Sequence, residues 1–124
     1  NAREDRIRDF AKINRYHVSL LPYFIERLKR MPEGDGTVLD NTLVMYGSPM
    51  GDPNVHNHKR CPLFFAGHAG GTLKGGLHIK AADGTPMANA FLDVLHKMGQ
   101  DDKAFGDSGG TIDLNAVQDT TAAR

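Results

Sequence analysis

The sequence predicts an α/β fold, read as part of a doubly wound sheet with parallel or mixed strands. Apolar residues at alternating steps of three and four indicate two helices, and short continuous apolar runs between them indicate buried strands. The predicted order is helix, strand, loop, strand, loop, strand, helix. Three strands and two helices leave sheet faces and an edge uncovered, so we expect the remainder of a longer chain or a homo-oligomer as partner.

The first predicted helix spans residues 2–31. Its apolar stripe follows the helical period through Ile7, Phe10, Asn14, His17, Leu21, Phe24, Leu28 and Met31. Pro22 lies inside this pattern, so we expect a kink or a break near Leu20–Leu21. His17 is read as a core histidine before it is read as a ligand. Pro32 and the glycines after it end the helix.

Three strands are predicted next. Residues 42–46 (TLVMY) and 62–66 (PLFFA) are continuous apolar runs, typical of strands buried on both faces in a parallel sheet. Residues 77–80 (LHIK) alternate between apolar and polar side chains, which favours a strand with one wet face near a sheet edge.

A second helix follows the strands. Thr85 is the predicted N-cap, Pro86 takes the first helical position, and Gly99 ends the helix. Its predicted buried stripe comprises Met87, Phe91, Val94, Leu95 and Met98. We therefore predict a single α/β domain over residues 1–114 and a flexible tail over residues 115–124.

Composition limits the classes of function. The 124 residues carry 15 basic and 15 acidic side chains, so no net field draws the chain to nucleic acid, and we expect no nucleic-acid partner. No apolar run reaches the length of a membrane span. Cys61 is the only cysteine, which excludes an internal disulfide; we read it as a packed residue and not a nucleophile. The chain begins with Asn, so it looks processed or cut from a longer one.

The first place to look for a site is the loop 47–61, because ligands of open α/β sheets bind beyond the carboxyl ends of strands. His56 and His58 stand two apart, so in an extended segment both imidazoles point to one side, and Asp52 or Asn54 can add an oxygen. Nitrogen and carboxylate donors suit a divalent metal such as zinc or, with more oxygens, calcium. A hydrogen-bonded or solvated polar loop is the other interpretation, and no cofactor is certain.

Two further glycine-rich stretches are predicted to be loops. Residues 67–76 (GHAGGTLKGG) fit neither the P-loop nor the dinucleotide-binding spacing. Residues 106–110 (GDSGG) spell the nucleophile segment of chymotrypsin-like proteases, but those enzymes need two β-barrels that an α/β chain does not provide.

The long helix, "LDNTLVMYGS", a polar loop and "CPLFFAG" together resemble the C-terminal part of the alkaline-phosphatase-like superfamily, which includes the sulfatases. In sulfatases the equivalent strand is followed by Ser-Asp-His-Gly or Ser-Asp-Asn-Gly, and the acid and its neighbour bind the catalytic metal. Here Pro49 and Met50 replace that pair, and neither side chain is a ligand of zinc or of a hard cation. The resemblance therefore implies altered or lost hydrolysis.

A closer resemblance links four segments in order: "YGSPMGDPNVHNHKRCPLFFAG", "LKGGLHIK", "TPMANAFLDVLHKMG" and "FGDSGG". They are similar to a bacterial domain family of unknown function within the same superfamily, over roughly residues 12–114. Its members are longer and typically exported, which implies a periplasmic or cell-envelope location. The resemblance also implies that this chain is the C-terminal part and that any nucleophile lies upstream.

In related branches of the superfamily a histidine shortly before the second strand helps to hold metal. His56 or His58 occupies a comparable place, and Lys59 or Arg60 is a candidate contact for a phosphate or sulfate group. Three functions remain open: a protein of this fold with altered or lost catalysis, a metal-dependent hydrolase of phosphate or sulfate esters, and a non-enzymatic binding or scaffold protein of the envelope.

Overall fold

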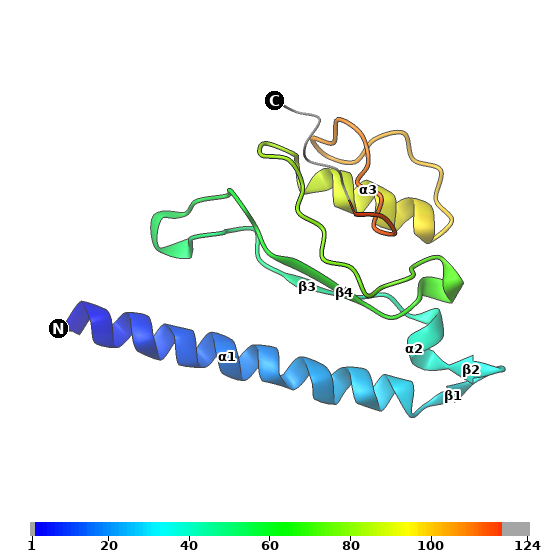
Figure 1. The fold of residues 1–124 in the computed structure, drawn as a ribbon, viewed down its shortest axis with the longest axis horizontal. Helices are drawn as coiled ribbons and strands as arrows, with labels where there is room; N and C mark the ends of the chain where they lie inside the picture. The colour runs from blue at the N-terminus through cyan, green and yellow to red at the C-terminus, as the bar shows by residue number, and fades with distance from the viewer. Residues whose placement is uncertain (1, 118–124) are drawn as a thin grey trace. The chain divides into compact units, whose positions relative to one another are not determined.

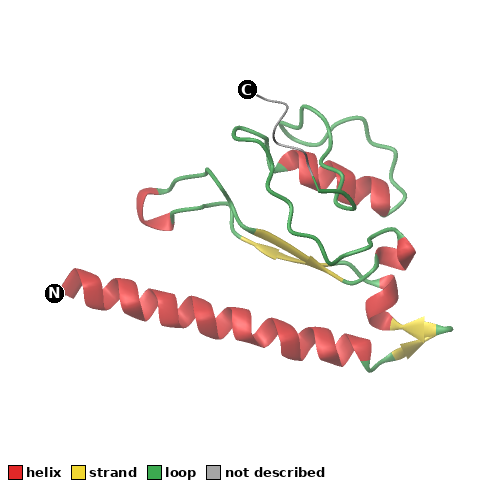
Figure 2. Ribbon diagram, in the orientation of Figure 1, coloured by secondary structure: helices red, strands yellow, loops and turns green. Residues whose placement is uncertain are grey.

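The computed structural model describes residues 2–117, drawn as a ribbon in Figure 1, and shows a mixed α/β chain. Its internal contacts form two compact units, one ending at Leu39 and the other beginning at Asp40. Helices account for most of the regular structure, and the strands are short, as Figure 2 shows.

The first unit is dominated by helix α1, Ala2–Lys29. The predicted break near Leu20–Leu21 is wrong, because the helix continues through Pro22 (Figure 1). Proline removes one hydrogen bond from the ladder, and the remaining bonds of a 28-residue helix keep the segment helical. The apolar stripe forms no core here: Ile7, Phe10 and Phe24 are each about half exposed.

A small hairpin follows α1 and was not expected from the sequence. Strand β1, Pro32–Glu33, pairs antiparallel with β2, Gly36–Thr37. Gly34 makes the turn with a positive φ of 56°, a conformation that glycine adopts without steric cost. A short helix, α2, then covers Val38–Asn41.

The second unit contains the other two-stranded sheet, β3 (Val44–Gly47) with β4 (Leu63–Ala66). Both strands were predicted, but as parallel strands, and the structure pairs them antiparallel. The reason is the connection between them, which turns back as a long hairpin instead of crossing over through a helix. Residues 77–80 form no strand, so the third predicted strand is wrong.

The hydrogen bonds fix which backbone groups of β3 face β4. The amide of Ser48 donates to the carbonyl of Pro62 at 3.1 Å, so position 48 faces the partner strand. In an antiparallel pair the direction of the backbone N–H and C=O groups alternates from residue to residue. Val44 and Tyr46 therefore also direct these groups toward β4. Met45 and Gly47 consequently turn their N–H and C=O groups to the outer edge of β3.

The two faces of this sheet differ in their cover. Directly opposed residues share a face, so Met45, Gly47, Leu63 and Phe65 lie on one face, which we call the pocket face. Leu63 and Phe65 pack against the core of the unit. The other face carries Tyr46 and Phe64, which are 38% and 44% exposed. The prediction that both strands are buried on both faces is therefore wrong.

Helix α3 spans Ala88–Lys97. Its N-cap is Met87 and not the predicted Thr85. The chain enters the helix through a tight 3₁₀-like turn, in which the amide of Asn89 donates to the carbonyl of Pro86 and that of Ala90 to the carbonyl of Met87. Gly99 ends the helix as predicted, with a φ of +83°.

The buried side of α3 also differs from the prediction. The residues that the structure buries in this helix are Ala88, Asn89, Ala90 and Leu92. Of the predicted stripe, Met98 is 55% exposed and the other four members are only partly buried. A chain segment after α3 accounts for the difference, because Ile112 and Leu114 join Ala90 in the core.

The core of this unit is small and joins α3 to two loops. It consists of Ala69, Leu73, Ala90, Ile112 and Leu114. Side chains of α3 hold the last segment in place: Asn89 accepts the amide of Gly109 at 3.0 Å, and Asp93 accepts that of Leu114 at 3.1 Å. The segment after Asp101 is therefore irregular, as predicted, but firmly anchored.

Asn115, in the predicted tail, also forms hydrogen bonds to the loop before it in space, residues 72–74. Its side chain accepts the amide of Lys74 and donates to the carbonyl of Thr72. Residues 118–124, the rest of that predicted tail, lie outside the described residues. Across residues 2–117 the structure has no helix with the length and hydropathy needed to span a membrane.

Candidate functional site: the loop after β3 and the pocket beside it

The loop from Ser48 to Pro62 connects β3 to β4. Its first turn is closed by Ser48, whose hydroxyl donates to the carbonyl of Met50 at 2.9 Å and accepts the Met50 amide at 3.1 Å. This pair of bonds occupies the hydroxyl, so Ser48 acts here as a turn residue.

The middle of the loop is a narrow hairpin that bonds to itself. Asp52 and Asn57 form an isolated antiparallel bridge, and the carbonyl of Asn57 also accepts the Gly51 amide at 2.8 Å. The two arms approach so closely that a Cβ on Gly51 would collide with the carbonyl of Lys59. Residues 51–60 are nevertheless all exposed, so the loop is ordered by its own backbone and not by burial.

Asp52 and His56 lie at the two ends of a single 3₁₀ turn, Pro53–Val55. The carboxylate of Asp52 accepts the amide of Asn54 at 3.0 Å and so caps the turn. His56 closes it in the left-handed conformation, with a φ of 51°. Both candidate ligands thus have a local structural role, which the sequence pattern did not reveal.

His58 is held in a way that bears on metal binding. Its Nδ1 lies 2.8 Å from the carbonyl of Pro49, and a carbonyl only accepts, so Nδ1 carries the proton. In the neutral imidazole, Nε2 then keeps its lone pair, as in a histidine that ligates a metal through Nε2. The thiol of Cys61 points to the same carbonyl at 3.1 Å, so Pro49 links both residues to the start of the loop.

The predicted metal ligands do not assemble into a site on their own. Within residues 2–117 no group of three or more His, Cys, Asp or Glu side chains is placed to hold a metal ion. Asp52 uses its carboxylate as a cap, and His58 offers one nitrogen. Any zinc or calcium ion at His56, His58 and Asp52 would therefore need donors beyond those that the described residues bring together.

The candidate anion contacts, Lys59 and Arg60, are exposed and form no ion pair within the described part of the chain. Arg60 has a φ of +55°, which is unusual for a residue with a side chain. The structure thus leaves both cations accessible to solvent, and their anion-binding role stays a prediction.

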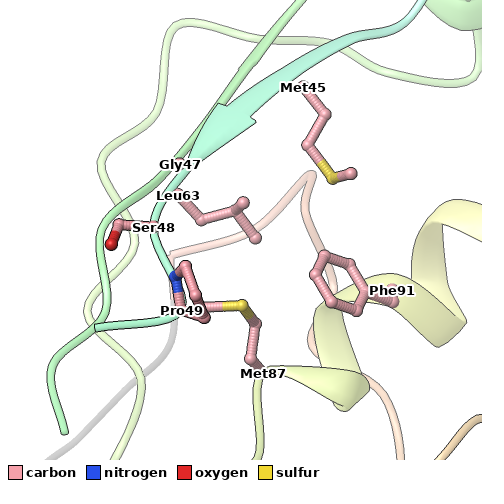
Figure 3. A pocket seen from close by; sticks show the side chains of 7 residues that line it. All are labelled: Met45, Gly47, Ser48, Pro49, Leu63, Met87 and Phe91. Carbon is pink, nitrogen blue, oxygen red and sulfur yellow. The ribbon is translucent and has the colours of Figure 1, made fainter. Parts of the chain in front are cut away.

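A pocket that the sequence analysis missed lies beside the end of β3, on the pocket face of the sheet. It has a volume of about 240 Å³ and is lined by Met45, Gly47, Ser48, Pro49, Leu63, Met87 and Phe91. Figure 3 shows Met45, Leu63 and Phe91 pointing toward a common space, with the hydroxyl of Ser48 directed away from it. None of these seven residues has a charged side chain or one that acts as an acid or base near neutral pH.

Sequence reasoning had one signal for this pocket. Met87 and Phe91 stand four residues apart on one side of the predicted helix, and both were read as core residues. Only the antiparallel pairing of β3 with β4 shows that Met45 and Leu63 line one open pocket with them.

The two glycine-rich stretches behave as loops. In the first, the single hydroxyl proton of Thr72 is shared between the carbonyls of Ala69 and Lys97, which lie 2.9 and 3.1 Å from Oγ1. In the second, the hydroxyl of Ser108 accepts the amide of Phe105 at 2.8 Å, which closes a turn. The prediction of a loop is confirmed for residues 106–110, whereas residues 67–76 also contain a short 3₁₀ helix, Ala69–Gly71, and two buried core residues, Ala69 and Leu73.

Comparison with known proteins gives no assignment for this chain: no family model, curated protein or solved structure matches it.

Proposed function

We propose that this chain is a non-catalytic binding part of a protein with an alkaline-phosphatase-like, doubly wound fold, and that the pocket beside β3 receives an apolar group. The observation that carries the proposal is the chemistry of the pocket. Two methionines, a phenylalanine, a leucine and a proline line it, and the hydroxyl of Ser48 is bonded to the backbone of Met50.

Loss of catalysis agrees with the residues that end β3. Hydrolysis of phosphate or sulfate esters needs a nucleophile and a group that stabilises charge on the leaving oxygen. Pro49 and Met50 supply neither function, and they stand where the resembling sulfatases place two metal ligands. Export to the periplasm or cell envelope, which the resemblance implies, stays a prediction.

The five methionines of the chain provide a direct test of the pocket. With ¹³C-labelled methionine methyls, toluene is titrated as the apolar probe and the methyl resonances are followed. We expect Met45 and Met87 to shift with saturation, because both line the pocket. Met31 and Met98 are 51% and 55% exposed, lie outside it and serve as internal controls.

A matched pair of variants sharpens this test. Met87→Lys places a charge in the pocket and is expected to abolish the shift at Met45, whereas Met98→Lys changes the same helix outside the pocket and leaves that shift in place. Equal shifts at all five methyls, or none at Met45 and Met87, would overturn the proposal.

A metal-dependent ester hydrolase is the second candidate, and one observation favours it: the bond from His58 to Pro49 leaves Nε2 ready to ligate. Elemental analysis after dialysis tests it, together with hydrolysis of p-nitrophenyl phosphate and sulfate in zinc or calcium. We expect no stoichiometric metal and no turnover above the blank. Both assays are run on the longest natural product that contains this chain, and turnover lost in His58→Ala would reverse our choice.

A further inference from the structure

We propose that Asp83 is a site of isoaspartate formation, at which the backbone amide of Gly84 attacks the side-chain carboxyl, and that the product is a substrate for an isoaspartyl carboxyl methyltransferase. The inference is independent of the pocket and of the proposed function. An Asp-Gly sequence favours this reaction, because glycine has no side chain to hinder its amide nitrogen. The chain contains two such sequences, Asp35-Gly36 and Asp83-Gly84.

The reaction requires no cofactor and no oxidant. The Gly84 nitrogen forms a bond to Cγ of Asp83, and the hydroxyl of the protonated carboxyl leaves with the amide proton as water. Water then opens the resulting succinimide ring at either of its carbonyls. Opening at the backbone carbonyl leaves the main chain running through Cγ. Isoaspartate therefore has the mass of aspartate, an additional main-chain atom and a free α-carboxyl.

The first support is the turn that contains the pair. The Thr85 amide donates to the Ala82 carbonyl at 3.1 Å, which closes a β-turn with Asp83 and Gly84 at its central positions. Gly84 has a φ of +86°, and Asp83 is not among the residues with a positive φ, so the turn is type II. Both central residues are exposed, so water reaches the reacting groups.

The second support is the freedom of the peptide group between Asp83 and Gly84. Across residues 2–117, neither the Asp83 carbonyl nor the Gly84 amide has a hydrogen-bond partner, and the Asp83 carboxyl forms no hydrogen bond or ion pair. Type I and type II turns differ by rotation of this central peptide, and glycine at the third position accepts both. The amide nitrogen therefore turns toward the carboxyl without breaking a hydrogen bond.

The other Asp-Gly pair differs in the state of its amide. Asp35 and Gly36 are also exposed, but Gly36 begins β2 and pairs with Glu33 across the hairpin. The Val38 amide donates to the Met31 carbonyl at 2.8 Å, so alternation along the ladder makes Glu33 and Gly36 the next hydrogen-bonded pair. The Gly36 amide must break this bond before it attacks Asp35. The chain thus presents the same dipeptide with a free amide and with a paired one.

The turn also suits recognition by the methyltransferase. Ala81 packs against the core and Met87 caps α3, so the exposed turn between them is held at both ends. The free α-carboxyl of the isoaspartate is accessible on this turn, and the enzyme transfers to it a methyl group from S-adenosylmethionine. The methyl ester then loses methanol as the Gly84 nitrogen closes the succinimide again, which returns part of the product to aspartate.

The test incubates the folded 124-residue chain at neutral pH in water labelled with ¹⁸O. Each opening of the ring inserts a labelled oxygen at the aspartate, which mass spectrometry assigns after digestion. Isoaspartate is counted separately in the digest, by transfer of a tritiated methyl group from S-adenosylmethionine with the purified methyltransferase. We expect both signals at Asp83 to exceed those at Asp35 at least about fivefold, since the Gly36 amide must first lose a bond.

The unfolded chain provides the reference for sequence alone. In urea both Asp-Gly pairs lose their turns, so we expect Asp35 and Asp83 to react within about twofold of each other. Two variants assign the methyl signal in the folded chain. Asp83→Glu keeps the charge at an exposed site but requires a larger ring, and it is expected to lose most of the signal. Asp35→Glu is the matched control and is expected to keep it.

Each outcome decides the assignment. Labelling largely at Asp83 in the folded chain, together with similar labelling of both sites in urea, supports it. Equal labelling of the two sites in the folded chain, or more at Asp35, would overturn it, because the free amide of Gly84 would then have no effect. Labelling of Asp83 in urea alone would overturn it as well, since the turn would then protect the site.

Discussion

The loop 48–62 and the segment 105–115 are both largely irregular and contain aspartate and asparagine, yet they are held in different ways. In the loop the hydrogen bonds join residues of the loop itself, many of them between a side chain and the backbone, and residues 51–60 are all exposed. In the segment, Asn89 and Asp93 of α3 reach residues about 20 positions away, and Ile112 and Leu114 are buried.

The two regions show that the conformation of a segment and its contribution to the stability of the unit can have different causes. Short-range bonds define the form of an exposed loop, but they bury little apolar surface and add little to the free energy of unfolding. The long-range anchors of the segment, in contrast, close the small core of the second unit. Variants in the segment are therefore expected to change global stability, and variants in the loop to change local order.

The largest effect is expected from Ile112→Ala. Ile112 is 8% exposed and belongs to the core, so its truncation removes buried methyl groups and leaves a cavity. We expect a loss of about 2–4 kcal/mol in the free energy of unfolding, measured by urea denaturation. Val117→Ala, at a residue that is 67% exposed, is the control. Equal losses in the two variants would show that the segment is not anchored as described.

Asn89→Ala is expected to rank second. The side chain is 9% exposed and accepts the amide of Gly109, which would be left without its partner. Leaving such a group unpaired costs about 1–3 kcal/mol. Asn54→Ala, in the exposed loop, is the comparison, and differential scanning calorimetry gives the shift in midpoint. A larger loss from Asn54→Ala would reverse the contrast between the two regions.

Gly51→Ala probes the loop, with a local outcome. The added Cβ collides with the carbonyl of Lys59, so the arms must separate and the bond from Asn57 to Asp52 weakens. We expect the Asn57 amide to exchange with deuterium about tenfold faster, while the amides of the core keep their rates. Gly109→Ala, where an added Cβ meets open space, is the matched control. Unchanged exchange at Asn57 would contradict the close approach of the arms.

The smallest effect on stability is expected from His58→Ala. The variant removes one bond at an exposed site, between the imidazole and the carbonyl of Pro49. We expect a loss below about 1 kcal/mol in urea denaturation, the usual range for surface changes. A loss larger than that of Asn89→Ala would mean that the loop stabilises the unit as strongly as the anchored segment does.

The sequence located most elements but not their pairing. The periodic segments and apolar runs predicted α1, β3, β4 and α3 within a few residues. The direction of the strands depends on how residues 48–62 fold back, and those exposed polar residues carry no period to predict it. Residues 77–80 alternate as a strand does, but no neighbouring strand pairs with them among the described residues.

The sequence predicted a polar loop after β3 but not the local structure of the candidate residues in it. Asp52, His56 and His58 were chosen as donors because of their types and spacing, but type and spacing do not show that Asp52 caps a turn or that His58 bonds to Pro49. The pocket escaped prediction for a related reason. Its walls come from β3, β4 and α3, and apolar residues on three elements look like three pieces of core until the register is known.

The exposed stripe of α1 has a consequence for handling the protein at the bench. Large apolar side chains of this stripe are about half exposed, among them Ile7, Phe10 and Phe24. A surface of this kind behaves as a hydrophobic ligand toward column matrices, plastic and other molecules of itself. Preparations are expected to lose protein as concentration or salt rises, and mild detergent is expected to recover it.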